Sequence, residues 1–260
     1  MVGRVLRISV APVKALGLVH PEEVELGPDG VVGDRRFWMV EEDGRLFNNK
    51  RHGPMVRTRV SWDEQTRALE LVLPDGTAAS GTVELGERVD AVMYDEPHPS
   101  RVVLGPWAEA ISAYVGRPIS LLWGEGHAKD RGYMGGTVSL VSRGSLARLA
   151  EEGGVEAVDG RRFRMLFEVD GVAAHGEDEW MDREVQLGEA AVVRINGDVG
   201  RCAVTTHDPD RGIRDLDTLE LLARYRPEGR TERLPLGVYG SVVQPGRVAV
   251  GDIVRPLPAG

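Results

Sequence analysis

The 260-residue chain is dominated by short apolar segments that end at turn-forming residues. Residues 4–10 alternate between apolar and polar side chains. Residues 35–47 reverse direction at an Asp-Gly pair, and residues 58–77 repeat the pattern. Segments of this length, bounded by Gly, Asp and Pro, are typical of β-strands joined by tight turns. The first part of the chain is therefore predicted to form an antiparallel sheet or barrel.

A change of pattern suggests where a first domain ends. Residues 94–100, with the sequence Y-D-E-P-H-P-S, are rich in turn formers. They are followed by apolar residues at helical spacing over residues 107–115, and Gly116 is expected to end that helix. We place the boundary in the turn-rich segment, which gives predicted domains of residues 1–95 and 96–260.

Most apolar segments of the second part are also short, and only two of them have helical spacing. Strands are predicted at residues 119–123, 137–142, 162–169, 184–187, 190–195, 202–206 and 246–255. Helices are predicted at residues 145–152 and 216–225. The polar, glycine-rich residues 123–136 are predicted to be either mobile or a lid over a site. Many strands with few helices favour a closed barrel, so the predicted fold class is mainly β with a few helices (α+β).

Charge and composition exclude several functions. The net charge of -9 argues against nucleic-acid binding, so an anionic ligand would need a local basic cluster. A single cysteine and scattered histidines do not supply the ligands of an iron–sulfur cluster or a structural zinc site. No apolar run approaches the ~20 residues of a membrane helix, and basic residues interrupt the first segment. We expect a cytoplasmic protein that does not associate with membranes.

The single cysteine, Cys202, stands in the sequence G-R-C-A-V-T-T-H-D-P. A free cysteine is usually a small buried apolar residue, and that is one interpretation here. The other is a thiolate ligand, because a cation such as Arg201 lowers the pKa of a nearby thiol. In a regular strand Arg201 would point to the opposite face, so its help requires irregular backbone, which Gly197 and Gly200 permit.

Other polar residues have two interpretations each. Thr205 and Thr206 are either ordinary strand residues or hydroxyl donors to an oxyanion, and we assign no chemistry to His207. Lys14 is either solvated or part of a site. Arg35 and Arg36 follow a glycine turn and could form a surface turn or a phosphate fork.

Arg162 and Arg164 raise the same question farther along the chain. In the predicted strand 162–169 they would share one face, which would require an anion if that face pointed inward.

These segments together resemble the MOSC family, which is named for the carboxy-terminal domain of molybdenum cofactor sulfurases. The chain is most similar to members with the family's N-terminal β-barrel domain, including amidoxime-reducing enzymes. The motifs that carry the resemblance are P-V-K, G-D-R-R-F-W-M-V-E-E-D-G, V-S-L-V-S-R-G-S-L-A, R-R-F-R, E-D-E-W, G-R-C-A-V-T-T-H-D-P and G-V-Y-G-S-V-V-Q-P-G-R-V-A-V-G-D. The resemblance implies a MOSC β-barrel plus a smaller N-terminal β-barrel-like domain.

The resemblance also implies a molybdenum–molybdopterin cofactor with Cys202 as the protein ligand of the metal. The residues implied to hold the pterin and its phosphate are Lys14, Arg35 or Arg36, Ser142, Arg164, Arg201 and Tyr239. Arg201, Thr205 and Thr206 are the predicted catalytic partners of Cys202, because their donors can stabilise charge on a substrate oxygen. The implied activity is the reduction of N-hydroxylated or N-oxide compounds with electrons from a separate protein.

The chain departs from the cofactor-binding pattern at three positions, where Ala15, Leu166 and Gly200 replace polar residues. Three lost polar contacts of ~1 kcal/mol each would weaken cofactor binding about a hundredfold. Two other functions therefore stay open. One is a sulfur or cofactor carrier that bears a persulfide on Cys202, and the other is a metal-free barrel that binds another anionic small molecule.

Overall fold

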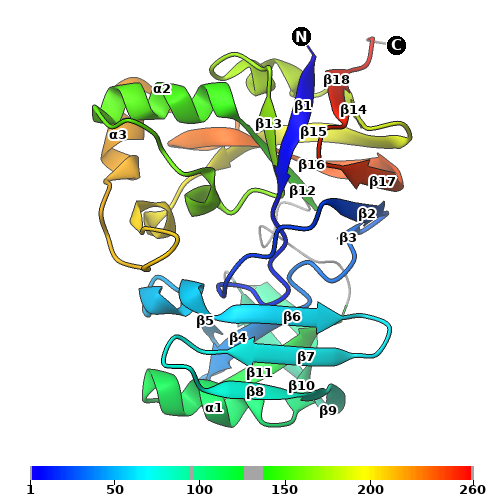
Figure 1. Cartoon of the computed structure of the whole chain (residues 1–260), viewed down its shortest axis with the longest axis vertical. Coiled ribbons are helices and arrows are strands. Elements are labelled where there is room, and N and C mark those ends of the chain that lie inside the picture. Colours follow the sequence, from blue (N-terminus) through cyan, green and yellow to red (C-terminus); the bar gives the residue numbers. More distant parts are fainter. Residues whose placement is uncertain (1, 94–95, 126–136, 259–260) are drawn as a thin grey trace.

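The computed structural model describes residues 2–93, 96–125 and 137–258. These residues form two bodies stacked along the long axis, with a barrel in the upper one and smaller sheets in the lower one (Figure 1). The predicted fold class, mainly β with a few helices, is confirmed. Among the described residues, no helix combines the length and the apolar character that crossing a bilayer requires.

The upper body is a closed barrel of seven strands. In barrel order these are β1 (Gly3–Ile8), β13 (Phe167–Asp170), β12 (Val138–Ser142), β16 (Pro235–Gln244), β15 (Ala191–Gly200), β14 (Glu184–Leu187) and β18 (Ile253–Pro256). Only the β12–β13 pair is parallel among these neighbours. Inward aliphatic side chains from these strands fill the interior, so the barrel is a packed core.

Smaller elements surround the barrel. A second apolar cluster joins it to helices α2 (Arg143–Gly153) and α3 (Thr218–Tyr225). Strands β2 (Glu23–Gly27), β3 (Gly30–Val31) and β17 (Gly246–Ala249) form a three-stranded sheet. Short 3-10 helices η2 (Gly160–Phe163), η3 (Gly176–Trp180) and η4 (Ala203–Thr206) lie in the connections.

The lower body is built from two antiparallel sheets around its own apolar core. The five-stranded sheet has the order β5 (Leu46–Phe47), β4 (Phe37–Glu41), β11 (Ile119–Gly124), β10 (Glu96–Leu104) and β9 (Glu84–Met93). The three-stranded sheet consists of β6 (Arg59–Asp63), β7 (Ala68–Val72) and β8 (Ala78–Thr82). The 3-10 helix η1 (Gly53–Arg57) and helix α1 (Trp107–Val115) complete this body.

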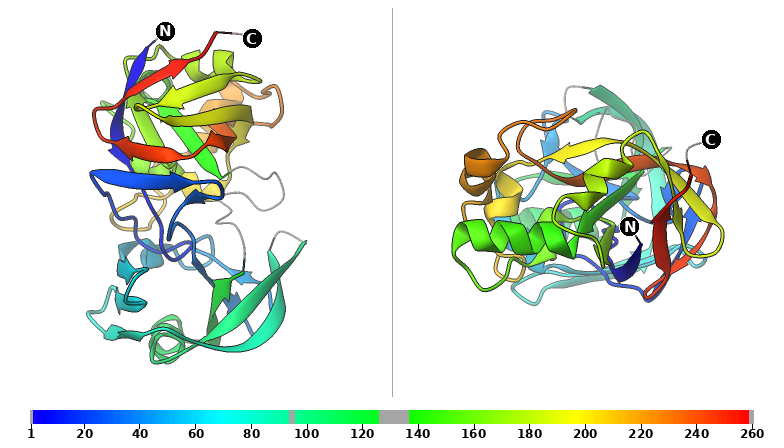
Figure 2. Two further views of the ribbon diagram at one scale, coloured as in Figure 1. Left: turned by 90° about the vertical axis from the view of Figure 1, so that its right-hand side faces the viewer. Right: turned by 90° about the horizontal axis from the view of Figure 1, so that it is seen from above.

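The chain passes between the bodies more than once. Strands β1 to β3 lie with the barrel, β4 to β11 with the lower body, and β12 to β18 with the barrel again (Figures 1 and 2). The division into domains of residues 1–95 and 96–260 stays a prediction. The predicted loop of residues 123–136 lies outside the described residues from residue 126 onward.

One predicted strand is wrong and another begins too early, and both fall at the predicted site. Residues 162–169 begin inside η2, and strand β13 starts only at Phe167, so Arg162 and Arg164 do not share a strand face. The Asp159 side chain accepts a hydrogen bond from the Arg161 N–H, which favours the tight turn over an extended chain. Residues 202–206 likewise contain η4 instead of a strand.

The turn-rich segment 94–100 also differs from expectation, because β10 begins at Glu96 and includes two prolines. Pro97 and Pro99 pair with β9, whereas β11 joins the other side of β10 only from Ser100. Proline lacks the N–H that a strand between two partners needs, so it is tolerated where one side of a strand is unpaired.

Glycines allow backbone contact between the two bodies. A Cβ on Gly53 of η1 would lie 1.9 Å from the carbonyl oxygen of Gly212, and one on Gly212 would lie 2.2 Å from the carbonyl oxygen of Gly53. At a second contact, the Gly17 N–H donates to the Thr58 carbonyl at 3.2 Å. The turn after η4 is thereby fixed against the lower body.

The motif E-D-E-W at residues 177–180 supports the barrel. Fully buried Glu177 accepts hydrogen bonds from the Ser142 N–H at 3.1 Å and from the Ser145 hydroxyl at 2.7 Å. The Ser142 side chain in turn caps α2 by accepting from the Ser145 N–H. Next to this network, burial lowers the pKa of His175 to about 4, with Arg226 and Arg148 adding to the shift.

Replacing Gly212 with Ala should destabilise the protein by about 2–4 kcal/mol, because a Cβ meets the Gly53 backbone and φ is +71°. Gly44→Ala is the matched control: its φ is +74°, and nothing lies within 4 Å of the added atom. Urea unfolding should show a loss of only about 1 kcal/mol for the control. Equal losses in the two variants would contradict the close approach.

Acidification should destabilise the wild type relative to a His175→Gln variant. The imidazole has a pKa of about 4 when folded and 6.5 when unfolded, so the unfolded chain binds more protons in between. The stability that the neutral imidazole contributes is present above pH 6.5 and is lost as the pH falls toward 4. Unfolding free energies at pH 7 and pH 5 would measure this, and a pH-independent difference would refute it.

Candidate functional site

Cys202 lies at the surface, directly after the end of β15. Its backbone is extended, with φ of -130° and ψ of 173°, and it is the residue that precedes η4. Its carbonyl accepts hydrogen bonds from the N–H and from the hydroxyl of Thr205, both at 3.0 Å. The interpretation of Cys202 as a buried apolar residue is therefore wrong, because the turn presents the thiol to the outside.

The hydroxyls of Thr205 and Thr206 form hydrogen bonds within this turn and with residues close to it. Both side chains are buried. The Thr205 hydroxyl, besides its bond to Cys202, lies 2.6 Å from the hydroxyl of Thr218 at the start of α3. The Thr206 hydroxyl donates to the Ala203 carbonyl at 2.8 Å and accepts from Arg214 Nε at 3.2 Å. These bonds hold Cys202 in place, and the catalytic role of the threonines stays a prediction.

Arg201, which follows β15, forms hydrogen bonds with β16 and with η2. Its Nε donates to the Leu236 carbonyl at 3.0 Å, and its Nη1 donates to the Phe163 carbonyl at 3.2 Å. Its guanidinium also lies over the Phe163 ring, 5.2 Å from the ring centre. The expected irregular backbone is present, because the β15–β16 register shifts between Asp198 and Gly200.

Gly200 shows why one family position lacks a side chain here. A Cβ at Gly200 would lie 2.9 Å from the Arg233 carbonyl oxygen. The backbone therefore excludes a serine at this position unless the neighbouring loop moves.

Arg35, Arg164 and the chain next to Lys14 are connected. Buried Arg35 pairs with Asp34, and its Nη2 donates to the Arg164 carbonyl at 3.0 Å. Arg164 Nη2 donates to the Leu16 carbonyl at 2.7 Å. Lys14 is itself buried, and its N–H donates to Phe37 at the start of β4. The structure thus brings these three predicted residues to one region between the bodies.

The other predicted residues have separate surroundings. Arg36 lies over the Trp123 ring, 4.7 Å from its centre, and faces Glu64 at 3.5 Å. Ser142 is fully buried in the network that caps α2. Tyr239 is buried in β16, where it pairs with β12 and β15. These contacts serve the fold, and the roles implied for the three residues stay predictions.

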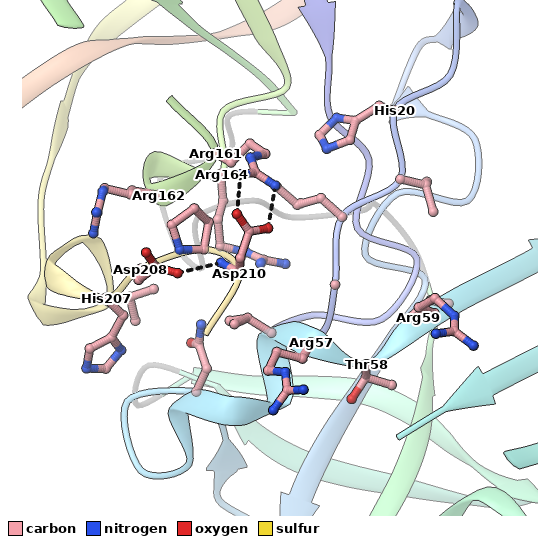
Figure 3. Close-up of a pocket in the computed structure, with 18 residues that line it drawn as sticks. His20, Arg57, Thr58, Arg59, Arg161, Arg162, Arg164, His207, Asp208 and Asp210 are labelled. Atoms are coloured by element: carbon pink, nitrogen blue, oxygen red, sulfur yellow. Dashed lines mark hydrogen bonds and ion pairs between the residues drawn. The ribbon is translucent and has the colours of Figure 1, made fainter. Parts of the chain in front are cut away.

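A cavity of about 530 Å³ lies between the two bodies, and Figure 3 shows how arginines from both bodies surround it. Its lining includes five arginines but only two aspartates. The arginines are Arg57, Arg59, Arg161, Arg162 and Arg164. Val204 within η4 and His207 directly after it also line the cavity, so the turn that carries Cys202 forms part of its wall.

Sequence reasoning missed Arg57, Arg59 and Arg161 as candidate ligands of an anion. The first two alternate in M-V-R-T-R at the start of the predicted strand pattern of residues 58–77, and alternation of this kind sends both side chains to one side. This alternation was visible in the sequence. The arginines on the opposite wall of the cavity, however, stand about a hundred positions later in the chain. Only the fold brings them together.

Two histidines that line the cavity have lowered pKa values. Burial is the largest cause that lowers the pKa of His207, and Arg214 is the next. Burial also lowers the pKa of His20, and the cations Arg7 and Arg161 contribute. Neutral imidazoles are favoured at both positions at pH 7.

The donor set of this region fits a phosphate-bearing metal cofactor. An exposed thiol is a suitable ligand for a soft transition metal, and guanidinium groups are suited to phosphate. Buried Lys14 supplies an ammonium group in this region, whereas the charge of buried Arg35 is balanced by Asp34. The departures Ala15 and Leu166 are both buried and apolar, so they add no polar side chain to this set.

Two relatives and one solved structure are similar to this chain. The chain is 36% identical over 107 residues to mitochondrial amidoxime-reducing component 1 of Mus musculus, covering 38% of this chain and 31% of that protein. It is 26% identical over 290 aligned positions to mitochondrial amidoxime reducing component 2 of Bos taurus, covering 98% and 84%. The YuaD protein of Bacillus subtilis superposes with a TM-score of 0.45 at 11% identity, covering 98% and 94%.

Family models divide nearly the whole chain between them. The model of the MOSC N-terminal beta barrel domain matches residues 2–96, and that of the MOSC domain matches residues 128–255. The chain therefore belongs to the MOSC family and carries the family's N-terminal β-barrel domain.

Proposed function

We propose that this protein is a molybdenum-cofactor-dependent oxidoreductase that reduces N-hydroxylated or N-oxide compounds. The observation that carries the proposal is the exposed Cys202 thiol, held on a hydrogen-bonded turn whose later residues Val204 and His207 line the cavity between the two bodies. Support comes from the relatives named amidoxime-reducing components. An exposed thiol also suits a reducing compartment such as the cytoplasm.

Each residue has a part in this proposal. Cys202 would hold the metal, and Lys14, Arg35 and Arg164 would hold the pterin and its phosphate. The bound cofactor would supply the two-electron chemistry of oxygen removal. Arg201 would act as a positioning residue, because its guanidinium fixes the end of β15 next to the thiol. Arg36, Ser142 and Tyr239 would support the site through the surrounding fold.

The proposed reaction consumes electrons that another protein must deliver. The N–O bond of the substrate breaks, two electrons and two protons are taken up, and the oxygen leaves as water. A flavin, haem or iron–sulfur protein would be the donor. The neutral His207 imidazole lies in the same turn, but we assign no proton transfer to it.

Metal and pterin analysis of protein expressed with cofactor supply tests the proposal. The wild type should contain molybdenum and pterin in similar amounts, and Cys202→Ala should lose most of the molybdenum because no other sulfur replaces the ligand. Arg233→Gln, which removes an exposed guanidinium, is the control and should keep both. Wild-type protein free of molybdenum and pterin, with its thiol fully reduced, would refute the proposal.

The exposed thiol also favours a second candidate function, in which Cys202 carries a persulfide to a partner. No electron donor would then be needed. Mass spectrometry separates the two functions, because a cyanide-labile sulfur on Cys202 without bound molybdenum would support the carrier. Such a sulfur should be absent from a molybdenum-loaded enzyme.

A further inference from the structure

The lower wall of the cavity presents two exposed arginines. Arg57 ends η1 and Arg59 begins β6, and both side chains are exposed. Neither forms an ion pair with any residue of ranges 2–93, 96–125 or 137–258. Elsewhere in the chain, exposed arginines such as Arg230 and Arg247 do pair with carboxylates.

The opposite wall holds its arginines in fixed positions. Arg161 pairs with Asp159 and with both oxygens of Asp210, at 2.7 and 2.8 Å for the latter. Arg162 makes two hydrogen bonds of 2.6 Å with Asp215. Figure 3 shows Arg161 and Asp210 on the upper side of the cavity and Arg57 and Arg59 on the lower side.

Positive charge therefore accumulates in the cavity of an acidic protein. Arg161 and Arg162 are already paired with carboxylates, so the excess positive charge of the lining comes mainly from Arg57 and Arg59, in a chain with a net charge of -9. Like charges that face each other across a partly desolvated space repel, and a bound anion removes that repulsion. Burial is the largest cause that lowers the pKa values of His20 and His207, and nearby arginines add to the shift.

The cavity walls are fixed before any ligand arrives. The Gly53–Gly212 contact and the Gly17–Thr58 hydrogen bond hold the two bodies together beside it. Its volume of about 530 Å³ is that of a small-molecule site and is larger than a bare anion fills. Leu18, Val56 and Val60 give part of the lining an apolar surface for an organic group.

We propose that this cavity binds a small phosphorylated molecule, with its phosphate between Arg57 and Arg59 on one wall and the η2 arginines on the other. A phosphate group can accept hydrogen bonds from two walls at once, because its three terminal oxygens point in different directions. A carboxylate offers two coplanar oxygens, which suit a single fork. The proposal does not rest on the molybdenum function, because Arg164 is the one residue of this lining that is also assigned to that cofactor, whereas Arg57 and Arg59 are not.

Calorimetric titration with inorganic phosphate, at low and constant ionic strength, tests the proposal. We expect saturable binding to the wild type and a loss of about tenfold or more in the double variant Arg57→Gln/Arg59→Gln. The charge-matched control is Arg88→Gln/Arg233→Gln, which removes two exposed guanidinium groups elsewhere and should change binding by about twofold at most. Acetate at the same ionic strength should bind more weakly than phosphate.

A second readout follows the cavity histidines by NMR. Bound phosphate should raise the pKa of His207 and of His20 in the wild type and in the control variant, but not in the Arg57→Gln/Arg59→Gln variant. Thermal unfolding establishes that both double variants are folded. Absence of saturable phosphate binding, equal binding by the two double variants, or equal affinity for acetate would overturn the proposal.

Cofactor content separates this site from the proposed molybdenum site. The Arg57→Gln/Arg59→Gln variant should keep the molybdenum and pterin content of the wild type while phosphate binding falls. Parallel loss of both would assign the cavity to the cofactor and overturn a separate phosphate site. Molybdenum-free wild-type protein that still binds phosphate through these arginines would refute the proposed function alone.

Discussion

The backbone contact between Gly53 and Gly212 is the constraint on which the region between the bodies depends. The segment that contains Cys202 leaves the barrel at the end of β15 and reaches the lower body at Gly212. Between these points, η4 and its threonine hydroxyls leave little freedom. The position of the thiol is therefore set by both bodies together, and a change in either one would move it relative to the other.

Arginine has two different uses in this structure. Arg35, Arg164 and Arg201 donate to backbone carbonyls of distant segments and so satisfy acceptors where irregular loops meet. Arg57 ends η1 and Arg59 begins β6, and neither side chain forms a hydrogen bond or an ion pair with the part of the chain that the structure describes. A basic motif in the sequence does not distinguish these uses, because the difference lies in which backbone the fold brings near the guanidinium.

Local features of the fold could be predicted from the sequence, and features set by distant contacts could not. The Asp-Gly hairpin between β4 and β5 and the end of α1 at Gly116 depend on residues next to each other, and both are confirmed. The strand predicted over residues 202–206 is wrong because Thr205 bonds to Cys202 and to Thr218 of α3. Apolar alternation over so short a segment does not reveal hydroxyls that bond to the backbone. Likewise, the cationic cavity combines residues 57–59 with residues 161–164, which no local pattern connects.

The pairing of β1 with β18 has a consequence for biosynthesis. These strands close the barrel, yet they stand almost 250 positions apart, and Figure 2 shows both chain ends at the same end of the molecule. One edge of β1 therefore has no strand partner until residues 253–256 have left the ribosome. A nascent chain of this protein would thus expose an unpaired strand edge for most of its translation, even though the lower body can complete its own sheets much earlier.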